Sequence, residues 1–287
     1  MNTSAIIAFV TAAEENSFSL AAEKLHLTQP GISKRIQSLE DHLRHRLFDR
    51  IGRRIYLTEA GKTFLPHAYE LLQSAQNGIN AVQNLDQSIT GKLAIATTQH
   101  IGLHHLATPI KNYAHTYHEV SLTLDFITSK QAYLDIQQGK LELAVITEPF
   151  HVDEELTFVP LWPESLVLVC AHEHPLSPMT GPTLAQISQY PAVLPSADSF
   201  TRRLIDNAFA AEGLTLNASS PSNFLEALKV ISSAGLGWTV LPTSLLDDSL
   251  QILDVPELNL MRHIGYLTHK QRTKSNAATA FIKSLLV

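Results

Sequence analysis

The chain is poor in the features that mark secreted, membrane-bound or disulfide-stabilised proteins. Among its 287 residues Cys170 is the only cysteine, which excludes an intrachain disulfide and suits a reducing compartment. No apolar run is long enough to span a bilayer, and the N-terminus lacks a basic stretch followed by an apolar one. We therefore expect a cytoplasmic protein with no membrane partner.

Signatures of the common enzyme classes are also missing. The sequence contains no G-x-S-x-G, no G-x-G-x-x-G and no P-loop. Gly235-Leu236-Gly237 precedes an expected strand and follows an expected helix, which is the reverse of a dinucleotide-binding fingerprint and indicates a helix end with a tight turn. We expect neither catalysis nor a cofactor.

The formal net charge of −6 is unevenly distributed. Residues 1–62 carry nine Lys or Arg and seven Asp or Glu, a balance of +2, and the rest of the chain carries −8. A basic N-terminal part on an acidic body discourages indiscriminate contact with nucleic acid. A balance of only +2 predicts weak binding by one copy, so two or more copies should act together.

The most informative stretch is Ser17–Arg54. Helical spacing of apolar residues predicts a short helix over 19–26 and a second over 29–43, with Thr28 as its N-cap and Pro30 in its first turn. A further helix is expected over 3–16. Two helices joined in this way form a helix-turn-helix, in which the start of the second helix meets base edges in a DNA groove.

A basic hairpin follows the second helix. Residues 48–49 and 55–57 can pair as strands across a turn at Gly52, which predicts a wing that carries arginines toward phosphates or a minor groove. A solvated surface face is the alternative for these arginines. The side chains expected to face DNA are Ser17, Ser19, Thr28, Gln29, Pro30, Ser33, Lys34, Arg35, Gln37, Arg50, Arg53 and Arg54.

Three runs in this region, F-S-L-A-A-E-K-L-H-L-T-Q-P-G-I-S-K-R-I-Q-S-L-E, then L-F-D-R, then L-T-E-A-G, carry a family resemblance. Over about the first sixty residues the chain resembles the N-terminal domain of the LysR-type transcriptional regulators. The resemblance implies a bacterial transcription factor with a winged helix-turn-helix domain over 1–58. It also implies binding to double-stranded promoter DNA and assembly into a homotetramer.

Residues 59–90 read as a linker helix, with Thr58 as N-cap and a helix over 59–89. Apolar residues at three-and-four spacing form a seam on this helix, which would be roughly 45 Å long. A sixty-residue domain cannot cover both long sides, so a partner helix from a second chain is expected, giving a homodimer. Packing against the chain's own C-terminal domain is the alternative.

Beyond residue 91 strands and helices alternate, which predicts open α/β sheets. Strands are expected over 92–97, 120–127, 142–146, 165–170, 192–194, 238–241 and 262–267, and helices over 101–117, 130–138, 200–212, 224–234 and 275–286. The resemblance implies two lobes like those of periplasmic solute-binding proteins, with lobe I over 91–161 and 266–287 and lobe II over 162–265. The chain would cross between them near 160–163 and 262–266.

Small hydroxyl residues follow several predicted strands just before a helix, a placement that suits a carboxylate or other oxyanion. Each of them could instead be a plain helix cap. The resemblance implies a small-molecule effector between the lobes. The residues expected to bind this anionic effector are Thr98, Gln99, His100, Ser129, Lys130, Ser196, Ser199, Phe200 and Asn223.

The chain has fourteen histidines, and the spacing of His100, His104 and His105 could place two imidazoles on one helical face. A metal site needs further ligands that converge in space, which the sequence does not show, so no metal ligand is predicted. The rival interpretation is a solute-binding or metal-sensing protein built on the same two-lobed domain. A solute-binding protein would leave the first sixty residues unexplained.

Overall fold

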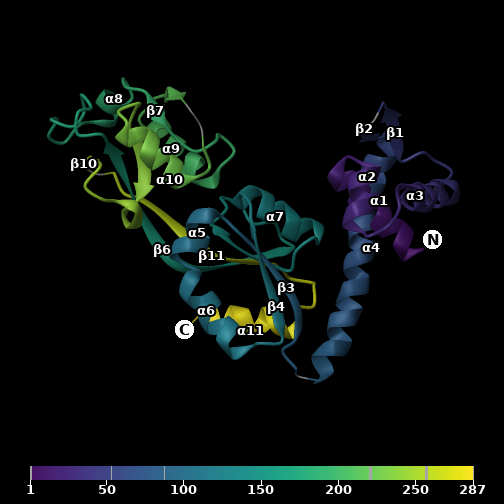
Figure 1. Ribbon diagram of the computed structural model, residues 1–287. Helices are drawn as coiled ribbons and strands as arrows, with labels where there is room; N and C mark the ends of the chain where they lie inside the picture. The colour runs from purple at the N-terminus through teal and green to yellow at the C-terminus, as the bar shows by residue number, and fades with distance from the viewer. Residues whose placement is uncertain (1, 53, 87, 220–221, 256–257, 287) are drawn as a thin grey trace. The chain divides into compact units, whose positions relative to one another are not determined.

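Figure 1 shows the protein as a computed structural model that describes residues 2–52, 54–86, 88–219, 222–255 and 258–286. The chain divides into two compact units, residues 1–86 with 138–140 and residues 87–137 with 141–287. No helix in these described ranges is both long and apolar enough to cross a membrane.

The first unit confirms the predicted winged helix-turn-helix. Its elements are α1 (Thr3–Glu15), α2 (Phe18–Lys24), α3 (Gln29–Leu43), β1 (Phe48–Ile51), β2 (Arg54–Leu57), α4 (Glu59–Gln83) and the 3₁₀ helix η1 (Asn84–Asp86). Helix α3 begins at its predicted cap, Thr28, whereas α2 begins one residue before its predicted start and has Ser17 as its cap. The Ser17 hydroxyl accepts the N–H of Leu20, and the Thr28 hydroxyl accepts the N–H of Gly31. The strands β1 and β2 pair antiparallel from Phe48↔Leu57 to Ile51↔Arg54.

A single apolar core fixes the angles between α1, α2, α3 and the wing. Phe9 and Ile32 are fully buried in it, and the Phe9 and Phe48 rings lie 5.4 Å apart. The buried carboxylate of Glu40 accepts the N–H groups of Leu47 and Phe48, at 2.6 and 3.3 Å. These bonds attach the start of the wing to α3, so the wing is positioned by the same core as the helix.

The long helix α4 is shorter than predicted. It ends at Gln83 and passes into η1, whereas the apolar spacing predicted helix as far as residue 89. Its first half packs on the helix-turn-helix core through Ala68 and Tyr69. Its second half leaves the apolar side chains of Ile79 and Val82 exposed, and Leu85 in η1 is 78% exposed.

The second unit is built on one curved seven-stranded sheet (Figure 1). Its strands are β3 (Gly91–Thr97), β4 (Val120–Phe126), β5 (Leu143–Thr147), β6 (Leu156–Cys170), β9 (Thr239–Pro242), β10 (Gln251–Leu253) and β11 (Leu260–His269). Strand β3 pairs parallel with β4 and β5, and the other pairings are antiparallel. The strand order is β10-β6-β11-β5-β3-β4, with β9 also paired to β6.

Two long antiparallel strands, β6 and β11, carry the chain between the lobes. They pair continuously from Leu260↔Leu166 to His269↔Leu156, with an irregularity at Ile264/Gly265. A Cβ on Gly265 would lie 2.2 Å from the carbonyl oxygen of Val159, so only glycine fits this register shift. The strand expected over 165–170 is longer in the structure, where β6 begins at Leu156.

Alternate residues of each strand pack into apolar cores on opposite faces of the sheet. In lobe I, one core holds Ile95 and Val145 against α6 (Ala107–Thr116) and α11 (Asn276–Leu285), and the other holds Ala96 and Ile146 against α7 (Ser129–Gln138). The single helix expected over 101–117 is two helices, α5 (Gln99–His104) and α6.

Lobe II repeats this plan with α9 (Phe200–Ala211) and α10 (Leu225–Ser233) on opposite faces. Val240 packs with Phe209 of α9, whereas Leu241 packs with Leu228 of α10. The remaining short elements are α8 (Leu184–Ile187), β7 (Ala192–Val193), β8 (Ala218–Ser219) and the 3₁₀ helix η2 (Thr243–Leu245).

Candidate functional site

The outward face of α3 carries the polar side chains that were expected to read DNA. Gln29, Lys34 and Gln37 are exposed, and Arg35 is half-buried. Gln29 donates to the Ser33 hydroxyl at 3.3 Å, which holds both side chains at the start of the helix. Within the described part of this unit, neither Lys34 nor Arg35 forms an ion pair, so both cations are available to phosphates or base edges.

The wing adds two further cations that the structure describes. The guanidinium of Arg50 lies 4.8 Å from the centre of the Phe18 ring, so a contact with the first turn of α2 holds it in place. Arg54 is exposed at the start of β2, while Arg53 lies outside the described residues. Ser17 and Ser19 sit at the start of α2, the helix that would cross the phosphates.

A cavity of about 170 Å³ lies between lobes I and II. Its lining mixes hydroxyl groups, aromatic rings and two cations. It is formed by Thr98, Gln99, His100, Phe126, Ile127, Thr128, Ser129, Lys130, Thr147, Pro195, Asp198, Ser199, Phe200, Thr201, Asn223, Phe224, Leu225 and Arg262.

Three helices of at least nine residues begin at this cavity: α7, α9 and α10. The N-terminal positions of α9 and α10, Ser199 and Phe224, make no side-chain capping bond. Backbone N–H groups in the first turn of a helix have no partner within the helix, and the helix dipole is positive at that end. The cavity therefore offers uncapped helix N-termini to an anion from two helices of lobe II, whereas α7 of lobe I is capped by the Thr128 hydroxyl, which accepts the N–H of Gln131.

An ion pair spans the two lobes at this cavity. The ammonium of Lys130, on α7, lies 3.2 Å from a carboxylate oxygen of Asp198 in lobe II, and both side chains are at least half exposed. Such an exposed pair contributes little to stability, about 0–1 kcal/mol. An anionic ligand can therefore compete with Asp198 for Lys130 at small energetic cost.

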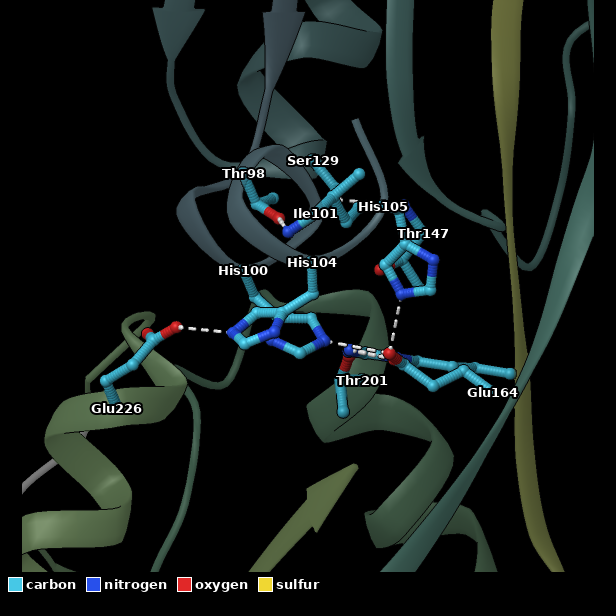
Figure 2. Close-up of polar contacts among 11 residues, drawn as sticks. Thr98, His100, Ile101, His104, His105, Ser129, Thr147, Glu164, Thr201 and Glu226 are labelled. Atoms are coloured by element: carbon cyan, nitrogen blue, oxygen red, sulfur yellow. Dashed lines mark hydrogen bonds and ion pairs between the residues drawn. The ribbon is translucent and has the colours of Figure 1, made fainter. Parts of the chain in front are cut away.

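A buried cluster centred on the carboxylate of Glu164 adjoins the cavity and shares His100, Thr201 and Arg262 with its lining (Figure 2). One of its oxygens is 2.8 Å from His100 Nε2 and 2.9 Å from His105 Nε2. The other accepts a hydrogen bond from Arg262 Nε at 2.7 Å, and the same guanidinium donates to Thr201 at 2.6 Å. Glu164 and Arg262 are register partners on β6 and β11. The Glu164 carboxylate thus connects the crossing strands to α5 of lobe I. Through Arg262 it also connects them to α9 of lobe II.

The electrostatics of this cluster keep Glu164 ionised. Burial alone would raise the pKa of its carboxyl group, but hydrogen bonds from His100 and His105 and the charge of Arg262 outweigh it and hold that pKa below its ordinary value. The buried guanidinium of Arg262 is matched by this carboxylate, as a buried charge requires.

A second carboxylate approaches the same histidines from lobe II. Figure 2 shows the His100 and His104 rings between the carboxyl groups of Glu164 and Glu226, and His104 Nε2 lies 3.9 Å from Glu226 Oε1. The ring centres of His100 and His104 are 4.7 Å apart. His100, His104 and Glu226 each offer one ligand atom, all within 4.8 Å of one another, so these three could hold a cation.

Comparison with known proteins identifies the chain. Residues 4–62 match the model of the bacterial regulatory helix-turn-helix protein, lysR family, and residues 86–286 match that of the LysR substrate binding domain. The chain belongs to the LysR family. It is a transcriptional regulator with an effector-binding domain, and not an enzyme.

Relatives of this LysR-family regulator include a probable RuBisCO transcriptional regulator of Cyanophora paradoxa, 29% identical over 284 residues that cover 96% of this chain and 88% of the relative. Two solved structures share the fold. Full-length CbnR with its target DNA has a TM-score of 0.66 at 18% identity and covers 99% of each chain. The effector-binding domain of QuiR with shikimate has a TM-score of 0.62 at 23% identity, covering 69% of this chain and 96% of that one.

The structure brings most of the expected effector residues of the LysR-family chain together. Those that line the cavity are Thr98, Gln99, His100, Ser129, Lys130, Ser199, Phe200 and Asn223. Ser196 is not part of the lining; its N–H donates to the side chain of Asn223 at 3.2 Å and so orients that amide. Thr98 and Ser129 also have structural bonds, since they accept the N–H groups of Ile101 and Thr147.

Sequence reasoning missed the charged cluster that adjoins the cavity. Glu164 and Arg262 occur singly in strands that otherwise read as apolar, and such a lone charge in a buried strand is the signal that could have identified them. Glu226 lies in the first turn of α10, where an acidic side chain is common because it interacts favourably with the helix dipole. Nothing local in the sequence shows that it faces His104.

Proposed function

We propose that this LysR-family regulator binds a pseudo-palindromic promoter site as a dimer or tetramer and responds to a small anionic effector held between lobes I and II. The observation that carries the effector proposal is the convergence of three helix N-termini and Lys130 on one cavity. The shikimate bound by QuiR is a carboxylate, which supports the same ligand class. A regulator that binds promoter DNA would act in the cytoplasm, where that DNA lies.

Paired recognition helices are the second part of the proposal. Two copies of α3 would enter adjacent major grooves roughly 34–36 Å apart. Ser33, Lys34 and Arg35 would meet bases or phosphates, and Arg50, Arg53 and Arg54 the backbone or minor groove. The exposed apolar side chains on the second half of α4 support pairing through that helix. CbnR, of the same fold, is known bound to its target DNA.

The DNA arm is tested with the promoter region flanking the protein's own gene, by fluorescence anisotropy at several salt concentrations. Arg35→Ala should weaken specific binding by about 1–3 kcal/mol if the side chain reads a base. Lys62→Ala removes the same charge from an exposed ion pair on α4 and is the matched control. Equal losses in the two variants would remove Arg35 from the reading face.

The effector arm is tested by a thermal-shift screen of small carboxylates, amino acids and inorganic anions. Lys130→Gln should abolish or strongly reduce the shift given by an anionic hit, because the variant loses the cation. Asp198→Asn breaks the same ion pair but leaves Lys130 free, so its shift should equal or exceed that of the parent protein. A loss of equal size in both variants would mean that the pair matters only as a bridge between the lobes.

A further inference from the structure

Three side chains meet beside the inter-lobe cavity, and two of them, His100 and Glu226, have buried polar atoms without a hydrogen-bond partner among the described residues. His100 and His104 come from α5 of lobe I, and Glu226 comes from α10 of lobe II. Both carboxylate oxygens of Glu226 and the Nδ1 atom of His100 are shielded from solvent and form no hydrogen bond with any described residue. A desolvated carboxylate without a donor is unfavourable, so these atoms favour a cation as their partner.

His100 is oriented as a metal ligand would be. Its Nε2 is 2.8 Å from the ionised carboxylate of Glu164, which assigns the ring proton to Nε2 and leaves a lone pair on Nδ1. Histidines that bind metals usually donate their other ring N–H to a carboxylate in this manner, which fixes the tautomer and makes the ligand nitrogen more basic.

His104 supplies a second nitrogen on the same face of α5. It lies four residues after His100, the spacing with which helices commonly present two imidazoles to one metal ion. Its ring centre lies 4.7 Å from that of His100, and its Nε2 lies 3.9 Å from Glu226 Oε1, so this nitrogen faces the carboxylate of the other lobe. About a third of the side chains of His104 and Glu226, 34% each, is exposed, although the carboxylate oxygens themselves are shielded.

We propose that His100, His104 and Glu226 form a binding site for a divalent transition-metal ion of the zinc class that joins lobe I to lobe II. Two imidazole nitrogens with one carboxylate favour Zn²⁺, Co²⁺ or Ni²⁺ over Mg²⁺ or Ca²⁺. Ligands of a tetrahedral zinc ion are about 3.4 Å apart, whereas these ligand atoms lie within 4.8 Å of one another. A bound ion would therefore draw α10 toward α5.

A second group, His100, His105 and Glu164, has similar spacing but is a poorer site. Both oxygens of Glu164 already accept hydrogen bonds, from the two histidines and from Arg262. Its role is to orient His100. The proposed metal site adds to the regulator and does not depend on the anionic effector or on DNA binding.

The test uses the untagged full-length protein, freed of metal, and titrates it with Co²⁺ and Zn²⁺ at neutral pH. Co²⁺ should bind once per chain with the visible absorption of a four-coordinate site, Zn²⁺ should displace it, and Mg²⁺ should not. His104→Gln and Glu226→Gln should each weaken binding by more than about tenfold, the loss that even a change outside the ligand set can produce. His118→Gln, at an exposed histidine, is the matched control and should bind as the parent does.

Metal affinity equal to the parent's in a folded His104→Gln or Glu226→Gln variant would overturn the proposal. Weak binding of both metals by the parent would do so too. An equally large loss of metal affinity in His118→Gln would also count against it. The two ligand variants lie on different lobes, so one remains informative if the other fails to fold. Metal-free variants should still bind promoter DNA as the parent does. A failure of DNA binding in the parent itself would count against the proposed function and not against the metal site.

Discussion

Replacing Glu164 with glutamine should lower the stability of the second unit more than removing any member of an exposed ion pair does. The substitution keeps the shape of the side chain but leaves the buried guanidinium of Arg262 without its counter-charge. Removing one member of a buried ion pair typically destabilises a protein by about 3–5 kcal/mol. Glutamine can still accept one hydrogen bond from Arg262, so we expect a loss near the lower end of that range, about 3 kcal/mol.

Glu148→Gln is the matched control, because it changes the same residue type opposite the neighbouring position of β11. Glu148 pairs with His263 at 2.9 Å, but the two side chains are 45% and 44% exposed. An exposed pair contributes about 0–1 kcal/mol, so this variant should unfold close to the parent protein.

The pH dependence separates the charge of Glu164 from its shape. Because the pKa of Glu164 is depressed in the folded state, its ionised form stabilises the fold above its ordinary value of 4.5, and this stabilisation is lost as the pH falls below that value. The glutamine variant lacks this contribution at every pH. The stability difference between parent and variant should therefore be full at neutral pH and shrink as the solution is made acidic.

Calorimetry of the parent and the two variants measures the effect. A loss of about 3 kcal/mol corresponds to a melting point lower by roughly 6–12 °C for a unit of this size. A Glu164→Gln protein within 1 °C of the Glu148→Gln control at neutral pH would refute the argument that the buried cluster is held together by charge. A difference that stays constant with pH would show that shape, and not ionisation, matters.

Three other perturbations have clear expected outcomes. A Cβ on Gly61 would meet the carbonyl oxygen of Leu47 at 2.2 Å, so Gly61→Ala should destabilise the first unit by about 1–3 kcal/mol in a melting experiment. On the same helix a Cβ on Gly78 would have open space, so Gly78→Ala should be neutral or slightly stabilising. Burial raises the pKa of the Cys170 thiol to about 11, so native protein should resist alkylation at mildly basic pH until it unfolds. Val82→Asp places a charge on the exposed apolar part of α4 and should shift sedimentation toward the monomer.

Local signals in the sequence were sufficient for the helix-turn-helix and wing of the first unit, but not for the end of its long helix. The recognition helix α3 runs over the predicted residues, Gln29–Leu43, because Thr28 caps it, Pro30 fits its first turn and apolar side chains recur on one face. The end of α4 was misplaced because apolar spacing continues past Gln83 without contacts to sustain a helix; Leu85 is mostly exposed.

Errors in the second unit have physical reasons too. The break between α5 and α6 was missed although Pro109 lies in the first turn of α6, where its missing N–H is tolerated. The first half of β6 was missed because Pro160 and Pro163 argue against a strand. Pro160 is accommodated where the ladder shifts register opposite Gly265. Contacts such as Glu226 with His104 join residues more than a hundred positions apart, and no local pattern predicts them.

The position of the buried cluster limits how the lobes can move. Glu164 and Arg262 face each other on the two strands that pass between the lobes, and they bind His100 and His105 on one side and Thr201 on the other. A micromolar effector supplies about 8 kcal/mol in total, and only the part that differs between open and closed forms can move the lobes. Breaking the cluster would consume about 3–5 kcal/mol of that. If an effector draws the lobes together, a rotation of lobe II about an intact Glu164–Arg262 pair, exchanging only the exposed Lys130–Asp198 contact, would cost less than one that breaks the cluster.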